Sequence, residues 1–202
     1  MEVVEAKKSD LESFFVYLES QLSENGNGEI PLFQPMSREQ NGVPESTKEK
    51  FTVGFSHPFG DSSWRKLWVV KDTSGNIKGH IDLRHHSDGN RSHRVLLGMG
   101  VDLSCRKQGL GQRLIDVVVS FCQEKAEIDW LDLCVLSENY PAKNLYLKTG
   151  FSVVGEFKDQ YRIDGLSVSE TAMTKCVKNY AYKRLKRDCQ RVAFPVPMSH
   201  GG

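Results

Sequence analysis

Residues 95–114 read VLLGMGVDLSCRKQGLGQRL, and three patterns follow one another within this stretch. The apolar run from Val95 to Leu103 is typical of a buried strand, and residues 106–111 form a basic, glycine-containing turn. Apolar residues then recur at helical spacing, which predicts a helix that begins near residue 110. The apolar positions of this helix are Leu110, Leu114, Val117, Val118 and Phe121.

A strand, a glycine turn and a helix N-terminus in this order predict an anion site. The first N–H groups of a helix have no partner inside it, and the helix dipole adds partial positive charge at the same end. Gly109 and Gly111 would let a phosphate approach the backbone. Arg106, Lys107 and Arg113 add positive charge. We therefore expect this turn to bind a pyrophosphate.

Two common phosphate-binding motifs fit this turn poorly. A P-loop ends in Gly-Lys-Ser/Thr, whereas Gly111 is followed here by Gln112. A dinucleotide-binding fingerprint would require a small residue at Leu114, although Asp129 or Asp132 could supply the acid on the next strand. The fingerprint stays an alternative, as does an ordinary strand-to-helix turn without a ligand.

The composition limits the class of protein. A chain of 202 residues is long enough for one domain with an appendage, and a net charge of +1 gives no overall attraction to nucleic acid. The five cysteines are odd in number and never spaced as Cys-x-x-Cys, which favours reduced thiols over disulfides or a zinc site. No signal-peptide pattern and no apolar run of about 20 residues is present. We expect a cytoplasmic protein without a metal or a membrane partner.

The remaining patterns alternate between strand and helix. An α/β fold is expected, with a mixed, mostly antiparallel central sheet that is flanked by helices. The expected strands are residues 2–6, 67–70, 77–84, 95–103, 130–136, 151–163 and 166–177. A first helix would follow Ser9 or Asp10 as N-cap, and a late one would begin with Pro141. The inner face of the first helix would contain Leu11, Phe14, Phe15, Leu18 and Leu22.

Two segments differ in composition from the rest. Residues 23–63 are rich in Gly, Asn, Glu, Ser and Pro, and a connection of this length is usually functional or disordered. We expect a helix at about residues 46–53, within either an acceptor-side flap or a poorly ordered loop. Residues 178–202 contain six Lys or Arg residues against one acid. They predict a basic C-terminal appendage to a domain of residues 1–177, with a surface for an anionic partner as the alternative.

The turn at residues 106–111 resembles the Arg/Gln-x-x-Gly-x-Gly/Ala motif of the GNAT family of N-acetyltransferases, which binds the pyrophosphate of acetyl-CoA. Residues 138–151, ENYPAKNLYLKTGF, resemble the family's Asn-x-x-Ala-x-x-Leu-Tyr-x-x-x-Gly-Phe signature. Gly155, the stretch YRIDG at residues 161–165 and Met173 together are similar to the C-terminal hairpin of many bacterial members. The likeness covers residues 2–177 and is strongest from residue 95 onward.

The resemblance implies an acetyl-CoA-dependent N-acetyltransferase that acts by direct transfer to a primary amine in a ternary complex. A small-molecule amine is favoured over a peptide amine, because residues 23–63 could close over a compact substrate. The acceptor would bind between this segment and the final hairpin. The alternatives are a protein or peptide amine acetyltransferase and a catalytically silent acetyl-CoA-binding sensor. Family members are often homodimers, but no dimer seam is visible in this sequence.

The resemblance also implies roles for individual residues. The backbone of residues 99–101 would pair with the pantetheine arm like an added strand. Asn139 would hydrogen-bond the same arm, unless it only caps the following helix. The residues expected to bind acetyl-CoA are Met99, Gly100, Val101, Arg106, Lys107, Gln108, Gly109, Leu110, Gly111, Gln112 and Asn139.

Two residues are expected to take part in catalysis. Tyr146 matches the family tyrosine that protonates the leaving thiolate, because a phenol that titrates near about 10 stays protonated at neutral pH. Some relatives place a glutamate base on the strand before the second motif, where this chain has Cys134. Asp132, two residues earlier and thus on the same strand face, is our first candidate for the base. The alternatives are Asp102, His85, His86 and a chain of water molecules.

Overall fold

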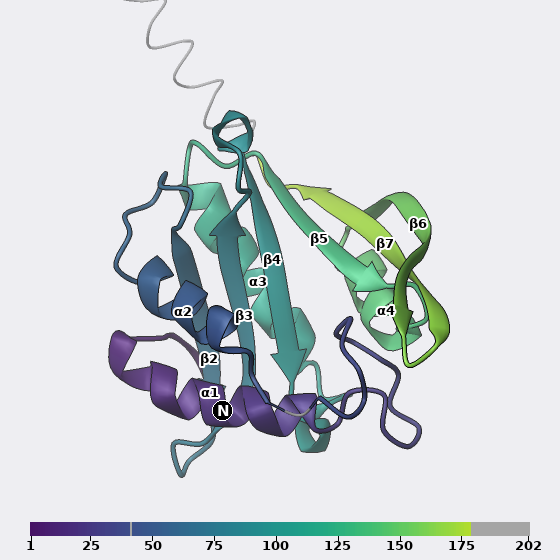
Figure 1. The fold of residues 1–202 in the computed structure, drawn as a ribbon. Helices are drawn as coiled ribbons and strands as arrows, with labels where there is room; N and C mark the ends of the chain where they lie inside the picture. The colour runs from purple at the N-terminus through teal and green to yellow at the C-terminus, as the bar shows by residue number, and fades with distance from the viewer. Residues whose placement is uncertain (41, 179–202) are drawn as a thin grey trace, which may run out of the picture.

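Strands β2 (Arg65–Lys71), β3 (Ile77–His85) and β4 (Arg94–Val101) form an antiparallel meander in the middle of a larger sheet. The computed structural model describes residues 1–40 and 42–178. They form a seven-stranded sheet in the order β1-β2-β3-β4-β5-β7-β6 (Figure 1). The other elements are β1 (Glu2–Glu5), α1 (Leu11–Leu22), α2 (Glu45–Gly54), α3 (Leu110–Glu124), β5 (Trp130–Leu136), α4 (Tyr140–Lys148), β6 (Ser152–Ile163) and β7 (Leu166–Cys176).

The sheet is mixed and mostly antiparallel, which confirms the predicted fold class. Among the described strands, only β4 and β5 pair in parallel. This pairing follows from the connection, because parallel neighbours need a crossover and helix α3 provides one. The helix expected near residues 46–53 is present as α2, and Pro141 is the second residue of α4 rather than the first.

Helices α1 and α2 cover one face of the sheet, and α3 and α4 cover the other (Figure 1). Helix α3 forms because its apolar residues recur on one stripe that packs against the central strands. Its buried residues are Leu110, Leu114, Ile115, Val118 and Cys122. Val117 and Phe121, which were expected on the same stripe, are only partly buried.

Helix α1 differs from its prediction in two respects. Neither predicted residue caps it with a side chain, because the Asp10 carboxylate instead accepts a hydrogen bond from the Lys7 N–H (2.8 Å). The inner face includes Tyr17, whereas Phe15 and Leu18 are only partly buried. Tyr17 turns inward because it packs edge-on against His80 of β3 (5.5 Å between ring centroids), a contact that apolar periodicity cannot reveal.

Strands β4 and β5 diverge after a short paired stretch. Their pairing extends only from Arg94 opposite Trp130 to Leu96 opposite Asp132. Figure 1 shows the two strands opening into a V below this point. Residues 97–101 of β4 therefore have no other described strand beside them on the β5 side. We call the paired part the closed end of the V and the unpaired part the open end.

Within residues 1–40 and 42–178, no helix has the length and apolar character that crossing a bilayer requires. The predicted basic appendage 178–202 lies outside the described residues except for Lys178, whose ammonium pairs with the Asp129 carboxylate (3.0 Å).

Candidate active site

The turn between β4 and α3 leaves a row of backbone N–H groups without protein partners. Lys107 (φ 61°) and Gly109 (φ 77°) both adopt the left-handed conformation, which turns the chain abruptly into the helix. The six N–H groups of residues 107–112 donate to no acceptor in the described part of the chain. They surround the N-terminus of a 15-residue helix, whose dipole also favours an anion.

The two glycines of the turn, Gly109 and Gly111, have different surroundings. A Cβ on Gly109 would meet no described heavy atom within 4 Å, so the space beside the backbone is open. A Cβ on Gly111 would lie 2.7 Å from Cδ2 of Leu145 in α4. Open space for a phosphate therefore exists at Gly109, whereas a side chain at Gly111 would displace Leu145 of α4.

Most charged and polar side chains of the turn bind other parts of the protein. Arg106 donates to the Val101 carbonyl oxygen (3.0 Å) and to the Glu24 carboxylate (3.0 Å), which ties the turn to the end of α1. Three more side chains donate hydrogen bonds: Gln108 to the Ser104 carbonyl oxygen, Gln112 to the Asp116 carboxylate, and Arg113 to the Met1 carbonyl oxygen. Lys107 has no ion-pair partner among the residues described, so its ammonium is available to an anion.

The backbone of β4 presents hydrogen-bonding groups to the open end at alternate residues. The Asp102 N–H donates to the Lys78 carbonyl oxygen (3.0 Å). Because bonding alternates along an antiparallel pair, Gly100 also turns its N–H and C=O groups toward β3. Met99 and Val101 turn theirs away from β3, into the open end. Of the three residues expected to pair with the pantetheine arm, Met99 and Val101 thus face the opening and Gly100 does not.

Gly98 and Gly100 make room for polar side chains of β3. A Cβ on Gly98 would lie 2.6 Å from an oxygen of Asp82, and one on Gly100 would lie 2.8 Å from Cε1 of His80. Burial lowers the pKa of His80 to about 4, so its imidazole is neutral at neutral pH. The glycines therefore place two buried polar groups on the α1 side of β4, next to the open end.

Asn139 is the N-cap of helix α4. Its side-chain oxygen accepts a hydrogen bond from the Ala142 N–H (3.3 Å). Its amide nitrogen donates to no acceptor within the described residues. Capping uses only one end of the amide, so the other end is free for a ligand.

Tyr146 lies on the inner face of α4. Its side chain is 7 % exposed, and its ring packs edge-on against Phe151 with 5.6 Å between the centroids. Burial raises the pKa of the hydroxyl, so the phenol stays protonated. The hydroxyl has no hydrogen-bond partner in the described chain, and it is not one of the fully enclosed polar atoms. It can therefore donate to a ligand.

Asp132 lies at the closed end of the V, among hydrogen-bond donors. Arg94 donates to it through Nε (2.7 Å) and Nη2 (2.5 Å), Thr174 donates through its hydroxyl (2.7 Å), and His86 Nε2 lies 3.1 Å away. Burial opposes ionisation, but these hydrogen bonds outweigh it and hold the pKa of Asp132 below its usual range. A carboxylate held in this way is a weak proton acceptor. Its role as the base stays a prediction.

The other three candidates for the base also have structural contacts. Asp102 accepts a hydrogen bond from the Ser104 N–H (3.0 Å), which caps the short 3-10 turn after β4. His85 lies near the closed end against Trp64 (5.2 Å between centroids), and burial lowers the pKa of its imidazole. His86 contacts Asp132, as described above.

One carboxylate near the open end was not predicted from the sequence. Glu170 of β7 accepts a hydrogen bond from the Tyr161 hydroxyl (2.9 Å). Burial, together with the adjacent Glu170 carboxylate, raises the pKa of the Cys134 thiol to about 11. Glu170 reaches Cys134 because β5 and β7 pair with Cys134 opposite Ala172. The sequence holds no local signal for this contact, since the pairing register brings together residues 36 positions apart in the chain.

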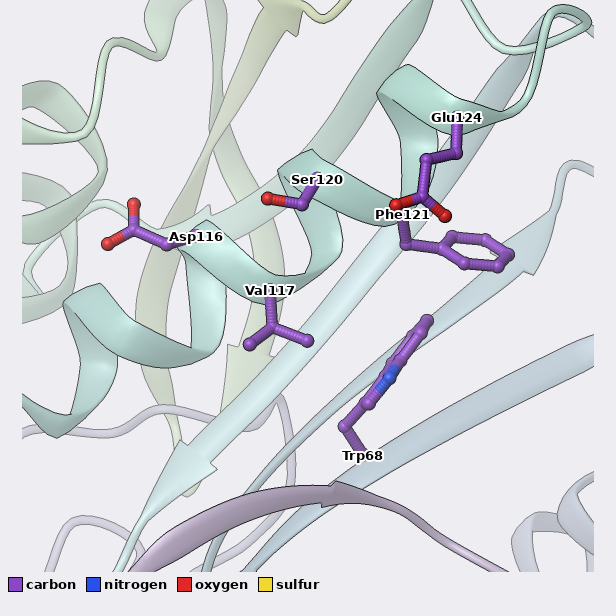
Figure 2. Close-up of a pocket in the computed structure, with 6 residues that line it drawn as sticks. All are labelled: Trp68, Asp116, Val117, Ser120, Phe121 and Glu124. Carbon is purple, nitrogen blue, oxygen red and sulfur yellow. The ribbon is translucent and has the colours of Figure 1, made fainter.

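A hollow on the other face of the sheet is separate from this region. Figure 2 shows it between α3 and β2, with the Trp68 and Phe121 rings packed edge-on (5.1 Å between centroids) and two carboxylates at the rim. Its lining consists of Trp68, Asp116, Val117, Ser120, Phe121 and Glu124. None of these was predicted as a site residue. Within the described chain, no group of three or more His, Cys, Asp or Glu side chains is placed to hold a metal ion.

Comparison with known proteins agrees with this geometry. Residues 33–151, more than half of the chain, match the family described as Acetyltransferase (GNAT) family. The chain is 29% identical over 115 residues to the L-amino acid N-acetyltransferase AaaT of Escherichia coli (strain K12), a match that covers 53% of this chain and 70% of that protein. It is 25% identical over 154 residues to the N-alpha-acetyltransferase daf-31 of Caenorhabditis elegans, covering 75% and 81%.

A solved structure has the same fold. The phosphinothricin acetyltransferase of Sinorhizobium meliloti, solved in complex with acetyl-CoA, superimposes with a TM-score of 0.69 at 15% identity, over 87% of each chain. The chain therefore belongs to the acetyltransferase (GNAT) family and is an acetyl-CoA-dependent N-acetyltransferase.

Proposed function

We propose that this enzyme transfers the acetyl group of acetyl-CoA directly to a primary amine of a small molecule, within a ternary complex. The observation that carries the proposal is the row of six unpartnered N–H groups at residues 107–112, next to the open end of the V. With the open space at Gly109 and the free ammonium of Lys107, these groups fit a pyrophosphate.

Different parts of the site bind acetyl-CoA and donate the proton. The turn holds the pyrophosphate, and the backbone groups of Met99 and the N–H group of Val101, whose carbonyl already binds Arg106, hold the pantetheine arm by strand-like hydrogen bonds. Asn139 can donate to the same arm through its amide nitrogen. When bound, acetyl-CoA supplies an activated acetyl group as a thioester. The Tyr146 hydroxyl, kept protonated by burial, donates a proton to the leaving sulfur.

Direct transfer is favoured over a covalent acyl-enzyme. The thiolate form of cysteine is the nucleophile, and the raised pKa of Cys134, at about 11, keeps its thiol protonated. The amine of the acceptor is then the group that attacks the thioester.

A compact acceptor is favoured by the segment at residues 23–40. The Asn25 side chain holds the segment together by accepting a hydrogen bond from the Phe33 N–H (2.8 Å). Arg38 then donates to the Asp164 carboxylate (2.9 Å) at the tip of the β6–β7 hairpin. The segment thus extends from α1 to the final hairpin (Figure 1) and limits the space for an extended chain. The L-amino acid specificity in the name of the bacterial relative agrees with a small acceptor.

A peptide α-amine is the second candidate. The observation that favours it is the match to an N-alpha-acetyltransferase over 75% of this chain. The same turn and the same tyrosine would serve both acceptors, so only the acceptor site distinguishes them.

Two measurements test the proposal. Calorimetry with acetyl-CoA should show binding, and absence of binding would overturn the assignment. Thiol release from acetyl-CoA should then be measured with a panel of L-amino acids, polyamines, and peptides that begin with Ala, Ser or Met. We expect faster release with a small amine than with any peptide. The reverse order would support the peptide enzyme, and binding without thiol release for every amine would support a silent sensor module.

A further inference from the structure

Strand β7 pairs with β5, so these two strands together form one side, or arm, of the V, and β4 forms the other. Glu170 lies on the β5–β7 arm, on the face of the sheet that α1 and α2 cover. Side chains alternate along β7, so Glu170 and Thr174 share a face. Thr174 hydrogen-bonds Asp132, and Asp132 shares its face with Cys134 two residues later. Glu170, Cys134 and Asp132 therefore lie on one face of this arm.

The other arm of the V, strand β4, also has residues on this face of the sheet. Leu96 of β4 is opposite Asp132 at the closed end, so Leu96, Gly98 and Gly100 share the face of Asp132. The glycines leave that face of β4 without side chains of its own. Glu170 thus borders the opening from one side, and the bare backbone of β4 borders it from the other.

Glu170 differs from the neighbouring carboxylates in its partners. It accepts a hydrogen bond from the Tyr161 hydroxyl and has no cationic partner among the described residues. Four other carboxylates on this face or at its edge are paired with cations. These are Asp82 with Arg65 and Arg84, Asp132 with Arg94, Asp102 with Lys78, and Glu24 with Arg106. A carboxylate without a cation, beside the opening in which the proposed function places the acceptor, can attract an ammonium and accept its proton.

We propose that Glu170 is the proton acceptor for the amine, an inference that rests on the proposed function. A primary amine at neutral pH is protonated and cannot attack. Glu170 removes one proton, the nitrogen forms a bond to the thioester carbon, and the carbon–sulfur bond breaks while Tyr146 protonates the sulfur. The nitrogen loses two protons in all. One replaces the proton that Tyr146 gave to the sulfur, and the other reaches solvent through Glu170.

Tyr161 is a positioning residue for this carboxylate. Its hydroxyl donates to Oε1 of Glu170, which leaves Oε2 for the amine. Burial and this hydrogen bond raise the pKa of Tyr161 to about 12, so it stays a donor.

The groups that face Glu170 permit a clean pH experiment. Tyr161 faces it from β6 and Cys134 from β5, while Arg84 and Asp132 act on the same thiol from further away. The pKa values of Tyr161 and Cys134, about 12 and about 11, mean that neither group changes charge between about pH 6 and about pH 9. A change in the pH profile over that range therefore reports on Glu170, on the amine and on the His86 imidazole that contacts Asp132, and the comparison of Glu170→Gln with wild type isolates the contribution of Glu170.

The test is Glu170→Gln, assayed with acetyl-CoA and the fastest amine of the panel above. We expect kcat/KM to fall about 100-fold at about pH 7, the usual contribution of a general base. The deficit should shrink as the pH approaches the pKa of the free amine, because solution then supplies neutral amine. Acetyl-CoA affinity by calorimetry and the melting temperature should stay at their wild-type values. Tyr161→Phe should lower kcat less, with the same kind of pH profile.

The matched control is Glu156→Gln, which removes an exposed carboxylate from β6 and should leave kcat/KM unchanged. Wild-type kcat/KM for Glu170→Gln at every pH would overturn the inference. An equal deficit at every pH would overturn it as well, because it would indicate a structural effect. A wild-type protein that acetylates no amine would instead overturn the proposed function, and this inference with it.

Discussion

The two ends of the V are formed by the same pair of strands, but their polar groups have different partners. At the closed end, Asp132 accepts hydrogen bonds from side chains of β4 and β7. At the open end, the backbone of Met99 and the N–H groups of residues 107–112 have no partner among the described residues. Polar groups that the protein satisfies hold a structure together, whereas unpartnered groups at a helix N-terminus are free for a ligand. We therefore expect substitutions at the closed end to change stability, and substitutions at the open end to change binding or turnover.

The largest expected effect is at the open end. Tyr146→Phe removes the proton donor but keeps the buried ring, so kcat should fall about 100-fold while the Kd for acetyl-CoA stays constant. Thiol release and calorimetry measure the two quantities. Tyr140→Phe, on the same helix but 64% exposed, is the control and should have wild-type kcat. An unchanged kcat for Tyr146→Phe would exclude the tyrosine from the mechanism.

The next effect belongs to the closed end. Asp132→Asn removes the charge that Arg94 binds, and should lower the free energy of unfolding by about 2 kcal/mol at about pH 7. The pKa of Asp132 is lowered in the folded state, so its stabilisation is present above the ordinary carboxyl pKa of about 3.9. It is lost as the pH falls through the lower folded pKa, and the difference from wild type should then narrow. Urea denaturation at several pH values measures this.

The control for this prediction is Asp88→Asn, at an exposed pair with Arg91, which should leave the free energy of unfolding close to its wild-type value. A stable Asp132→Asn protein with strongly reduced kcat would show instead that Asp132 is the base predicted from the sequence.

A smaller effect is expected at the turn of residues 106–111, where we propose that the pyrophosphate binds. Gly109→Ala places a methyl group in the open space at the turn, and should weaken acetyl-CoA binding about tenfold, the equivalent of one hydrogen bond to a charged group. The left-handed backbone should also cost about 1 kcal/mol of stability. Gly75→Ala is the matched control, because Gly75 is also left-handed (φ 84°) with open space around its Cβ position. Equal affinities for the two variants would contradict a phosphate site at Gly109.

The smallest effect concerns the Arg38–Asp164 ion pair, a bridge that joins the segment after α1 to the β6–β7 hairpin. Arg38→Ala removes the contact with Asp164, and because the pair is exposed its loss should leave the free energy of unfolding nearly unchanged. We expect the KM of a small amine to rise about threefold, with kcat unchanged. Arg162→Ala removes an exposed ion pair that stays within the hairpin, and should leave KM unchanged. Identical KM values for both variants would show that the bridge does not shape the acceptor site.

The sequence predicted the elements well where local patterns are strong. Helix α3, strand β5 and the hairpin about Asp164-Gly165 all lie where periodicity and turn residues placed them. The prediction was less accurate for α1, because the inward position of Tyr17 depends on His80 in a distant strand. The same limit applies to the candidate base. Spacing placed Asp132 on the same strand face as Cys134, but it could not show that Arg94 and Thr174 bind the Asp132 carboxylate.

The order of the elements, the glycine turn with its unpartnered N–H groups, and the tyrosine of α4 were determined by the sequence alone. All three depend on residues close together in the chain, whose spacing fixes their local geometry. The divergence of β4 and β5, the separate roles of Gly109 and Gly111, and the contact of Glu170 with Tyr161 and Cys134 were decided only by the tertiary structure. Each of these depends on strand register or helix packing between distant segments, and no local pattern of residues encodes such contacts.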